Sequence, residues 1–285
     1  GVDLVLSGFL FLFVLALLTP MFRGIYTEHI GSIESEFIAD ARFIAENFPH
    51  TGWHPFWYLG FPFHLAYQPI VPFGLALLHM LFRVPISTLY RILVAIFYAL
   101  GSVTTYFLAK ELGKSRLSGF AAGLAVALLP SVGYLLGEVR LMGESFGLPP
   151  WRLLVATFFG EGPHIIGLAI VPLAILAAIR VFEKPTRGWW IVFVGSTLFV
   201  LLTSFTAFMP LVLFLVLAWL SSVVYGHVRR KSIYLLLGLL FAFLIGSFWY
   251  NVSFLRTSLA FAENYGGGLF TGVYANPGLL IFLGF

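Results

Sequence analysis

Residues 4–22 read LVLSGFLFLFVLALLTPMF and contain no charged side chain. A helix that crosses a membrane needs about 20 mostly apolar residues to cover a hydrocarbon core about 30 Å thick. Residues 232–250, SIYLLLGLLFAFLIGSFWY, form a second run of this kind. Because such runs recur along the chain, the sequence predicts an all-α integral membrane protein, built as a polytopic helical bundle.

The composition excludes a soluble domain and several kinds of chemistry. Hydrophobic residues make up 60% of the chain and charged residues 10%, whereas soluble domains are roughly half apolar and about a quarter charged. The absence of cysteine excludes disulfides, thiolate catalysis and Cys-ligated zinc. The formal net charge of +4 is modest, and nothing in the sequence indicates nucleic-acid binding.

The apolar runs predict about eight spans within a single transmembrane domain, 1–285. The candidate spans are 4–22, 87–109, 117–136, 164–182, 188–204, 206–225, 232–251 and 277–285. The last run reaches the end of the sequence, so we expect the protein to continue beyond Phe285.

One further apolar run, 68–84, is interpreted as a juxtamembrane helix. It is short and is bounded or interrupted by Pro69, Pro72 and Pro85, and closely spaced prolines break or bound a helix. Such a segment suits the membrane interface better than the core. A short span that starts at a proline remains the alternative.

The distribution of charge orients the bundle. Basic residues cluster in three short links, 110–116, 180–187 and 229–231, which the positive-inside rule places in the cytoplasm. If 68–84 does not cross, the acidic outer loop 23–87 lies on the opposite side. The other two outer loops are then 137–163 and 252–276. We therefore expect any chemistry on the extracytoplasmic face of the plasma membrane.

The first outer loop carries a pair of carboxylates on an amphipathic helix. Glu36 and Asp40 are four residues apart, so they share a helix face and could converge on a metal ion or on a hydroxyl that needs a base. A solvated acidic face is the alternative interpretation. Glu34 precedes the pair and is a further possible metal ligand.

An aromatic stretch follows this helix. Residues 54–69 read HPFWYLGFPFHLAYQP, and His54, Trp57 and Tyr58 within it are candidate substrate-binding residues. Such a surface suits stacking on a sugar ring or an isoprenoid, although aromatic residues also serve as an anchoring belt at the membrane interface.

The second and third outer loops supply candidate phosphate contacts. Arg140 and Arg256 are cations near the expected membrane surface. Glu161 and His164 flank Gly162 and Pro163 at the start of a helix, where exposed amides and the helix dipole favour an anion such as a lipid phosphate. For each charge taken singly, interfacial snorkelling is the alternative.

These features together resemble the GT-C superfamily of polytopic glycosyltransferases. The resemblance rests on a first span, an acid-bearing outer helix, the 54–69 stretch, a juxtamembrane helix that begins at a proline, and a span ending in AKELGKSR at 109–116. The chain is more similar to poorly characterised prokaryotic members than to protein mannosyltransferases or oligosaccharyltransferases. Those branches carry Asp-Glu and Asp-x-Asp signatures, whereas this chain has Glu34-Ser35-Glu36 and Asp40.

The resemblance implies a fold of GT-C type and a sugar transfer that inverts the configuration at the anomeric carbon. The donor would be a sugar linked to polyprenyl phosphate in the membrane, and an outer-face carboxylate would deprotonate the acceptor. Glu36 would be the base or a metal ligand, with Asp40 second. Arg140, His164 and Arg256 would contact phosphate, and Glu34, Glu36 and Asp40 would hold a divalent cation, Mg²⁺ or Mn²⁺, if the enzyme needs one.

Two other classes of protein fit the same composition. A transporter or flippase is disfavoured because the predicted spans are nearly free of charge, whereas substrate pathways place ionisable groups at mid-membrane. A non-catalytic subunit of a larger membrane complex is the other alternative.

Overall fold

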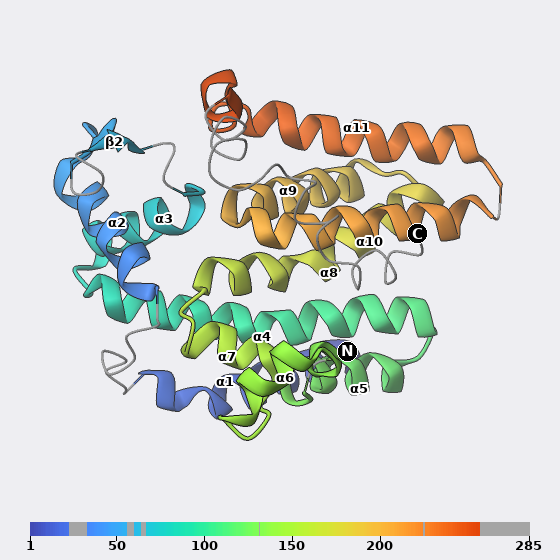
Figure 1. Cartoon of the computed structure of the whole chain (residues 1–285). Coiled ribbons are helices and arrows are strands. Elements are labelled where there is room, and N and C mark those ends of the chain that lie inside the picture. Colours follow the sequence, from blue (N-terminus) through green and yellow to red (C-terminus); the bar gives the residue numbers. More distant parts are fainter. Residues whose placement is uncertain (23–32, 56–59, 64–66, 131, 225, 257–285) are drawn as a thin grey trace.

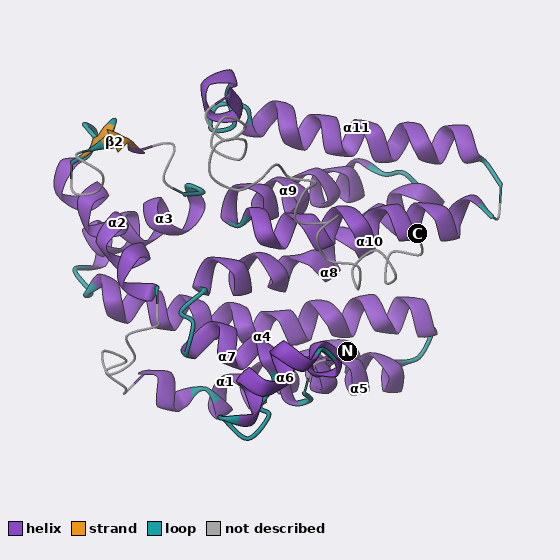
Figure 2. Cartoon of the chain, in the orientation of Figure 1, coloured by secondary structure: helices purple, strands orange, loops and turns teal. Residues whose placement is uncertain are grey.

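The computed structural model describes residues 1–22, 33–55, 60–63, 67–130, 132–224 and 226–256. Within them the chain is almost entirely helical, and the strand pair β1–β2 is the exception (Figure 2). The elements are α1 (Val2–Leu17), η1 (Thr19–Phe22), α2 (Glu34–Asn47), β1 (Trp53–His54), β2 (Phe61–Pro62), α3 (Ile70–Phe82), α4 (Ile86–Gly113), α5 (Arg116–Leu128), η4 (Val132–Leu135), α6 (Gly137–Glu144), α7 (Trp151–Thr157), α8 (Gly162–Glu183), α9 (Arg187–Thr203), α10 (Phe205–Val223) and α11 (Val228–Gly246).

The predicted all-α class is confirmed. Among the described residues, α4, α8 and α10 are long and apolar enough to cross a membrane. Four shorter helices are also apolar, namely α1, α3, α5 and α9. The total number of spans stays a prediction, and the run 277–285 lies outside the described residues.

In two of the predicted spans, 4–22 and 117–136, the helix ends earlier than predicted, and a proline explains the early end of each. α5 ends at Leu128 rather than at 136, because Leu129 precedes Pro130 and adopts extended angles, φ −85° and ψ 145°, as residues before proline do. α1 ends at Leu17, and a 3₁₀ turn that contains Pro20 follows it. The predicted end of 232–251 is also too late, because α11 stops at Gly246.

The bundle has two chemically different ends (Figure 1). The long helices run alongside one another, while α2, β1, β2 and α3 gather at one end. We call this group, residues 34–82, the cap. The opposite end holds the links 110–116, 180–187 and 227–231, which we call the basic end.

Ion pairs join four helices at the basic end. Asp3 of α1 accepts hydrogen bonds from Tyr106 and Arg116, and it forms an ion pair with Lys110 at 2.8 Å. Glu111 of α4 pairs with Arg180 of α8. α1 therefore runs antiparallel to α4. The C-terminal end of α1 and the N-terminal end of α4 both lie at the end of the bundle that carries the cap.

Close contact between α4 and α5 depends on two glycines. A methyl group added at Gly119 would lie 2.8 Å from the carbonyl oxygen of Tyr106, and one at Gly123 would lie 2.9 Å from that of Ser102. The spacing of four residues places both on one face, in the small-xxx-small arrangement that brings membrane helices together.

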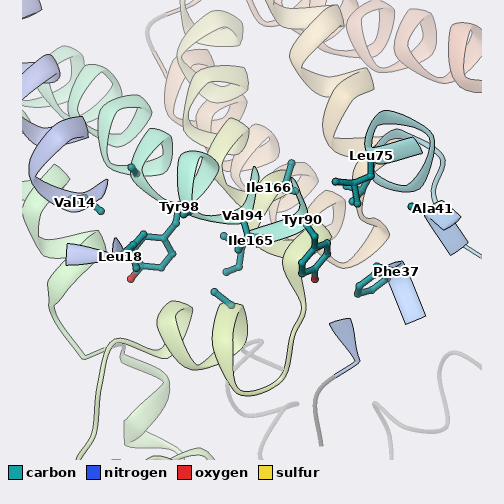
Figure 3. Close-up of a cluster of buried hydrophobic side chains, with 14 of the residues drawn as sticks. Val14, Leu18, Phe37, Ala41, Leu75, Tyr90, Val94, Tyr98, Ile165 and Ile166 are labelled. Atoms are coloured by element: carbon teal, nitrogen blue, oxygen red, sulfur yellow. The ribbon is translucent and has the colours of Figure 1, made fainter. Parts of the chain in front are cut away.

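A buried cluster ties the cap to the bundle (Figure 3). Phe37 and Ala41 of α2 and Leu75 of α3 lie near Tyr90 of α4, and each is no more than 1% exposed. The cluster continues through Ile165 and Ile166 of α8. The position of the carboxylates on α2 is therefore set by packing against the long helices.

Candidate functional site

Helix α2 carries Glu36 and Asp40, the predicted pair of carboxylates, on a side that is at least partly buried. Asp40 is 6% exposed, and Glu36, one turn earlier, is half-buried. Phe37 and Ile44 are each 1% exposed and turn the neighbouring stripe of the helix into the core. The predicted amphipathic helix is thus present, and it buries acidic side chains as well as apolar ones.

His54 of β1 lies directly against Asp40. Its Nε2 is 3.5 Å from Oδ1 of Asp40. The imidazole stacks on Phe61 and Phe63, with ring centroids 5.3 and 5.7 Å apart, and it is 5% exposed. The pairing of β1 with β2, in which His54 faces Phe61, holds the ring in this place.

Burial changes the acidity of both partners. Desolvation, followed by the negative charge of Glu36, raises the pKa of Asp40 to about 7. Desolvation lowers the pKa of His54. Near neutral pH the carboxyl group of Asp40 is therefore present in both its protonated and its ionised form. The imidazole beside it favours its neutral form.

A third carboxylate belongs to the same electrostatic group. Glu161 is the residue immediately before α8, and burial, together with the charge of Glu36, raises its pKa. Burial also raises the pKa of Glu36. Since the charge of Glu36 acts on both Asp40 and Glu161, ionisation of Glu36 favours the protonated form of the other two.

A chain of hydroxyl groups leads from this group to His164. The hydroxyl of Tyr67 interacts with that of Ser204, the oxygens of Ser204 and Thr206 are 2.8 Å apart, and Thr206 Oγ1 is 3.0 Å from Nδ1 of His164. Burial, then the charge of Glu161, raises the pKa of Tyr67. The four side chains form one polar network at the cap end of α8 and α10.

A cavity of about 540 Å³ opens beside this network. Its polar lining comes from Glu161, His164 and Thr206. The remaining lining residues are apolar: Ile33, Val139, Met142, Trp151, Val155 and Phe159. An apolar cavity with a few polar groups on one wall is the usual form of a small-molecule site.

The structure brings together five of the predicted site residues. Asp40 contacts His54, Glu36 acts electrostatically on Asp40 and Glu161, and Glu161 shares the cavity wall with His164. They come from α2, β1 and the start of α8, so the fold joins segments more than 100 residues apart.

The other predicted residues are placed differently. Arg140 of α6 forms an exposed ion pair with Glu144 at 2.7 Å and does not line the cavity. Arg256 is exposed beyond α11. Trp57 and Tyr58 lie outside the described residues.

Glu34 does not join the predicted metal set. Its Oε1 accepts a hydrogen bond from Nη2 of Arg91 at 3.0 Å, and helix positions two apart, such as 34 and 36, do not face each other. Among the described side chains, no three His, Asp or Glu residues are arranged to hold a metal ion. Glu34 is therefore not brought together with Glu36 and Asp40 as a set of possible metal ligands, and a requirement for a divalent cation stays a prediction.

Sequence reasoning missed Tyr67, Ser204 and Thr206. Tyr67 ends the aromatic stretch, and Ser204 and Thr206 interrupt two apolar runs, with Ser204 capping α10 through a hydrogen bond from the Ala207 amide. These interruptions are the only signal that the sequence offers, since the partner His164 is 42 positions away from Thr206.

Searches against known protein families and against curated proteins found no match to this sequence.

Proposed function

We propose that the chain is a membrane glycosyltransferase of GT-C type that transfers a sugar from a polyprenyl-phosphate donor on the extracytoplasmic face. The observation that supports this best is the group formed by Glu36, Asp40 and Glu161 beside a largely apolar cavity. Perturbed carboxylates at a cavity are typical of functional sites.

In this proposal Glu36 is the general base. It is half-buried, burial raises its pKa, and its negative charge favours protons on Asp40 and Glu161. The acceptor O–H gives its proton to Glu36, the acceptor oxygen bonds to the anomeric carbon, and the bond from that carbon to the phosphate oxygen breaks. Polyprenyl phosphate leaves with the bonding electrons, and the configuration at the anomeric carbon is inverted.

The cavity suits the lipid part of the donor, because its apolar walls match an isoprenoid chain. The proposed steps use protein side chains.

The proposal is tested by reconstituting the full chain in vesicles with polyprenyl-phosphate-linked hexoses that are radiolabelled in the sugar, with a cell-envelope extract as acceptor. We expect label to leave the lipid and appear on an acceptor. Label that stays on the lipid contradicts the proposal. If the labelled lipid also changes leaflet, the result favours a flippase, and inactivity in both assays favours a non-catalytic subunit.

The proposed orientation predicts where a cysteine reacts in this cysteine-free chain. Ser35 is exposed in the cap and Lys184 is exposed at the basic end. Because basic links stay in the cytoplasm, we expect Ser35→Cys to react with an impermeant maleimide added outside intact cells. Lys184→Cys, the matched control, reacts only after the cells are opened. The reverse pattern would refute an extracytoplasmic site.

A further inference from the structure

A second cavity lies near the basic end, far along the bundle from the candidate site. It occupies about 840 Å³ between α4, α8 and α10, within the range of roughly 300–1,000 Å³ that is usual for ligand pockets. No residue of the network around Glu36 lines it. We call it the basic-end cleft.

Most of the basic-end cleft is apolar. Leu108 of α4, Ile175 and Ile179 of α8, and Phe214 and Leu217 of α10 line it. Leu217 is 48% exposed, as expected for a residue on the outer side of a helix that faces lipid. The walls are therefore suited to a hydrocarbon chain that enters from the side.

The polar part of the lining contains a cation without a carboxylate partner. Lys231 is 8% exposed, and its Nζ donates a hydrogen bond to the carbonyl oxygen of Ser222. Within the part of the chain that the structure describes, no carboxylate forms an ion pair with it. An ammonium has three N–H donors, so two remain for a ligand.

The carboxylates in the same lining already have partners. Glu111 pairs with Lys114 and Arg180, and Glu183 lies 3.7 Å from Nη1 of Arg180. The lining itself holds two lysines and two glutamates, and Arg180, just outside it, pairs with both glutamates. The charge left without an opposite partner at the mouth of the cleft is therefore that of Lys231, which is complementary to an anion.

Aromatic residues at the same level are typical of a membrane interface. Nε1 of Trp219 donates to Ser232 Oγ at 3.0 Å, and the guanidinium of Arg180 lies 6.0 Å from the ring centroid of Trp189. Tryptophan and arginine at helix ends mark the headgroup region. This composition around Lys231 is the one expected at the level of lipid phosphates, next to the apolar walls of the cleft.

From this arrangement we infer that the basic-end cleft binds one anionic phospholipid of the surrounding membrane, with an acyl chain between α4 and α10 and the headgroup phosphate at Lys231. The site is separate from the proposed transfer reaction and holds whether or not the chain is an enzyme. The lipid would fill the gap between two helices that are joined mainly through α8.

Lipid binding can be measured by native mass spectrometry of the full chain in detergent, titrated with phosphatidylglycerol or with phosphatidylcholine of identical acyl chains. Lys231→Gln removes the buried charge, and Arg229→Gln removes an exposed charge from the same helix turn. Ala218→Phe adds a ring to the cleft wall, and Leu220→Phe adds one outside the cleft.

We expect one phosphatidylglycerol to bind in preference to phosphatidylcholine. Lys231→Gln should weaken it about fivefold, the factor that corresponds to about 1 kcal/mol for a cation near an anionic headgroup, and Ala218→Phe should abolish it. Both control variants should bind as the wild type does. Equal binding of the two lipids, or equal losses in Lys231→Gln and Arg229→Gln, would overturn the inference. A cleft that takes neither lipid would also overturn it. If Ala218→Phe does not fold, the Lys231 and Arg229 pair still decides the outcome.

Discussion

Glu36→Gln is expected to reduce the rate of sugar transfer by about 10²–10⁴-fold, which is the usual contribution of a general base. The amide keeps the size of the side chain but cannot accept the proton of the acceptor. Since the substitution leaves the cavity lining intact, we expect the loss in kcat and little change in KM for the donor. Initial rates in vesicles at several donor concentrations measure both.

Glu46→Gln is the matched control, because Glu46 is an exposed carboxylate on the same helix. It should leave kcat unchanged. Equal activity of Glu36→Gln and the wild type would show that Glu36 is not the base. Asp40→Ala and Glu161→Gln would then be the next variants to assay, since these carboxylates share its electrostatic group.

Asp40→Asn is expected to change how the stability of the fold depends on pH. The pKa of Asp40 is about 7 in the folded chain, against an ordinary value of 3.8. Between these values the folded chain keeps a proton that the unfolded chain releases. The stabilisation is complete below pH about 4 and is lost as the pH rises toward 7.

The expected size of this effect is about 4 kcal/mol, because one pKa unit corresponds to about 1.4 kcal/mol. Asparagine resembles the protonated acid, so the variant should match the wild type near pH 3, below the ordinary pKa of 3.8, and exceed its stability at pH 8. Denaturant unfolding of the full chain at the two pH values gives the comparison. Burial also raises the pKa values of Glu36 and Glu161. These two groups therefore also make the stability of the fold fall as the pH rises, and their contribution remains in the variant.

Glu46→Gln again serves as the control and should change the stability at neither pH. A variant whose stability follows that of the wild type across the range would mean that Asp40 ionises normally in the folded chain. The two variants together separate roles, because Glu36→Gln tests the proton acceptor while Asp40→Asn tests the buried neighbour.

The positions of the helices could be predicted from the sequence better than their ends or the side-chain contacts between them. Apolar run length located α4, α8 and α10, because this signal is local. α1 and α5 end earlier than apolar run length alone predicts, because Pro20 and Pro130 lie just beyond them, and Leu129-Pro130 is a recognisable helix stop.

Parts of the candidate site were predictable for the same reason. Glu36 and Asp40 share a helix face by their spacing, whereas the contact of Asp40 with His54 depends on how the cap folds. Arg140 was assigned to a phosphate although Glu144 lies four residues later, where a local ion pair is the simpler expectation. The hydroxyl chain from Tyr67 to His164 joins distant segments, and residue spacing carries no information about it.

Two contacts that hold the N-terminal end of α2 in place imply an order of assembly. Glu34 pairs with Arg91 of α4, and the amide of Ile33 donates to the carbonyl of Phe159, just before α8, at 3.0 Å. Both partners are synthesised after α2, and contacts between distant segments form late in folding. The carboxylate group is thus completed only after α4 and α8 have docked. A chain whose long helices are intact but poorly docked should keep its helix content and lose its site first.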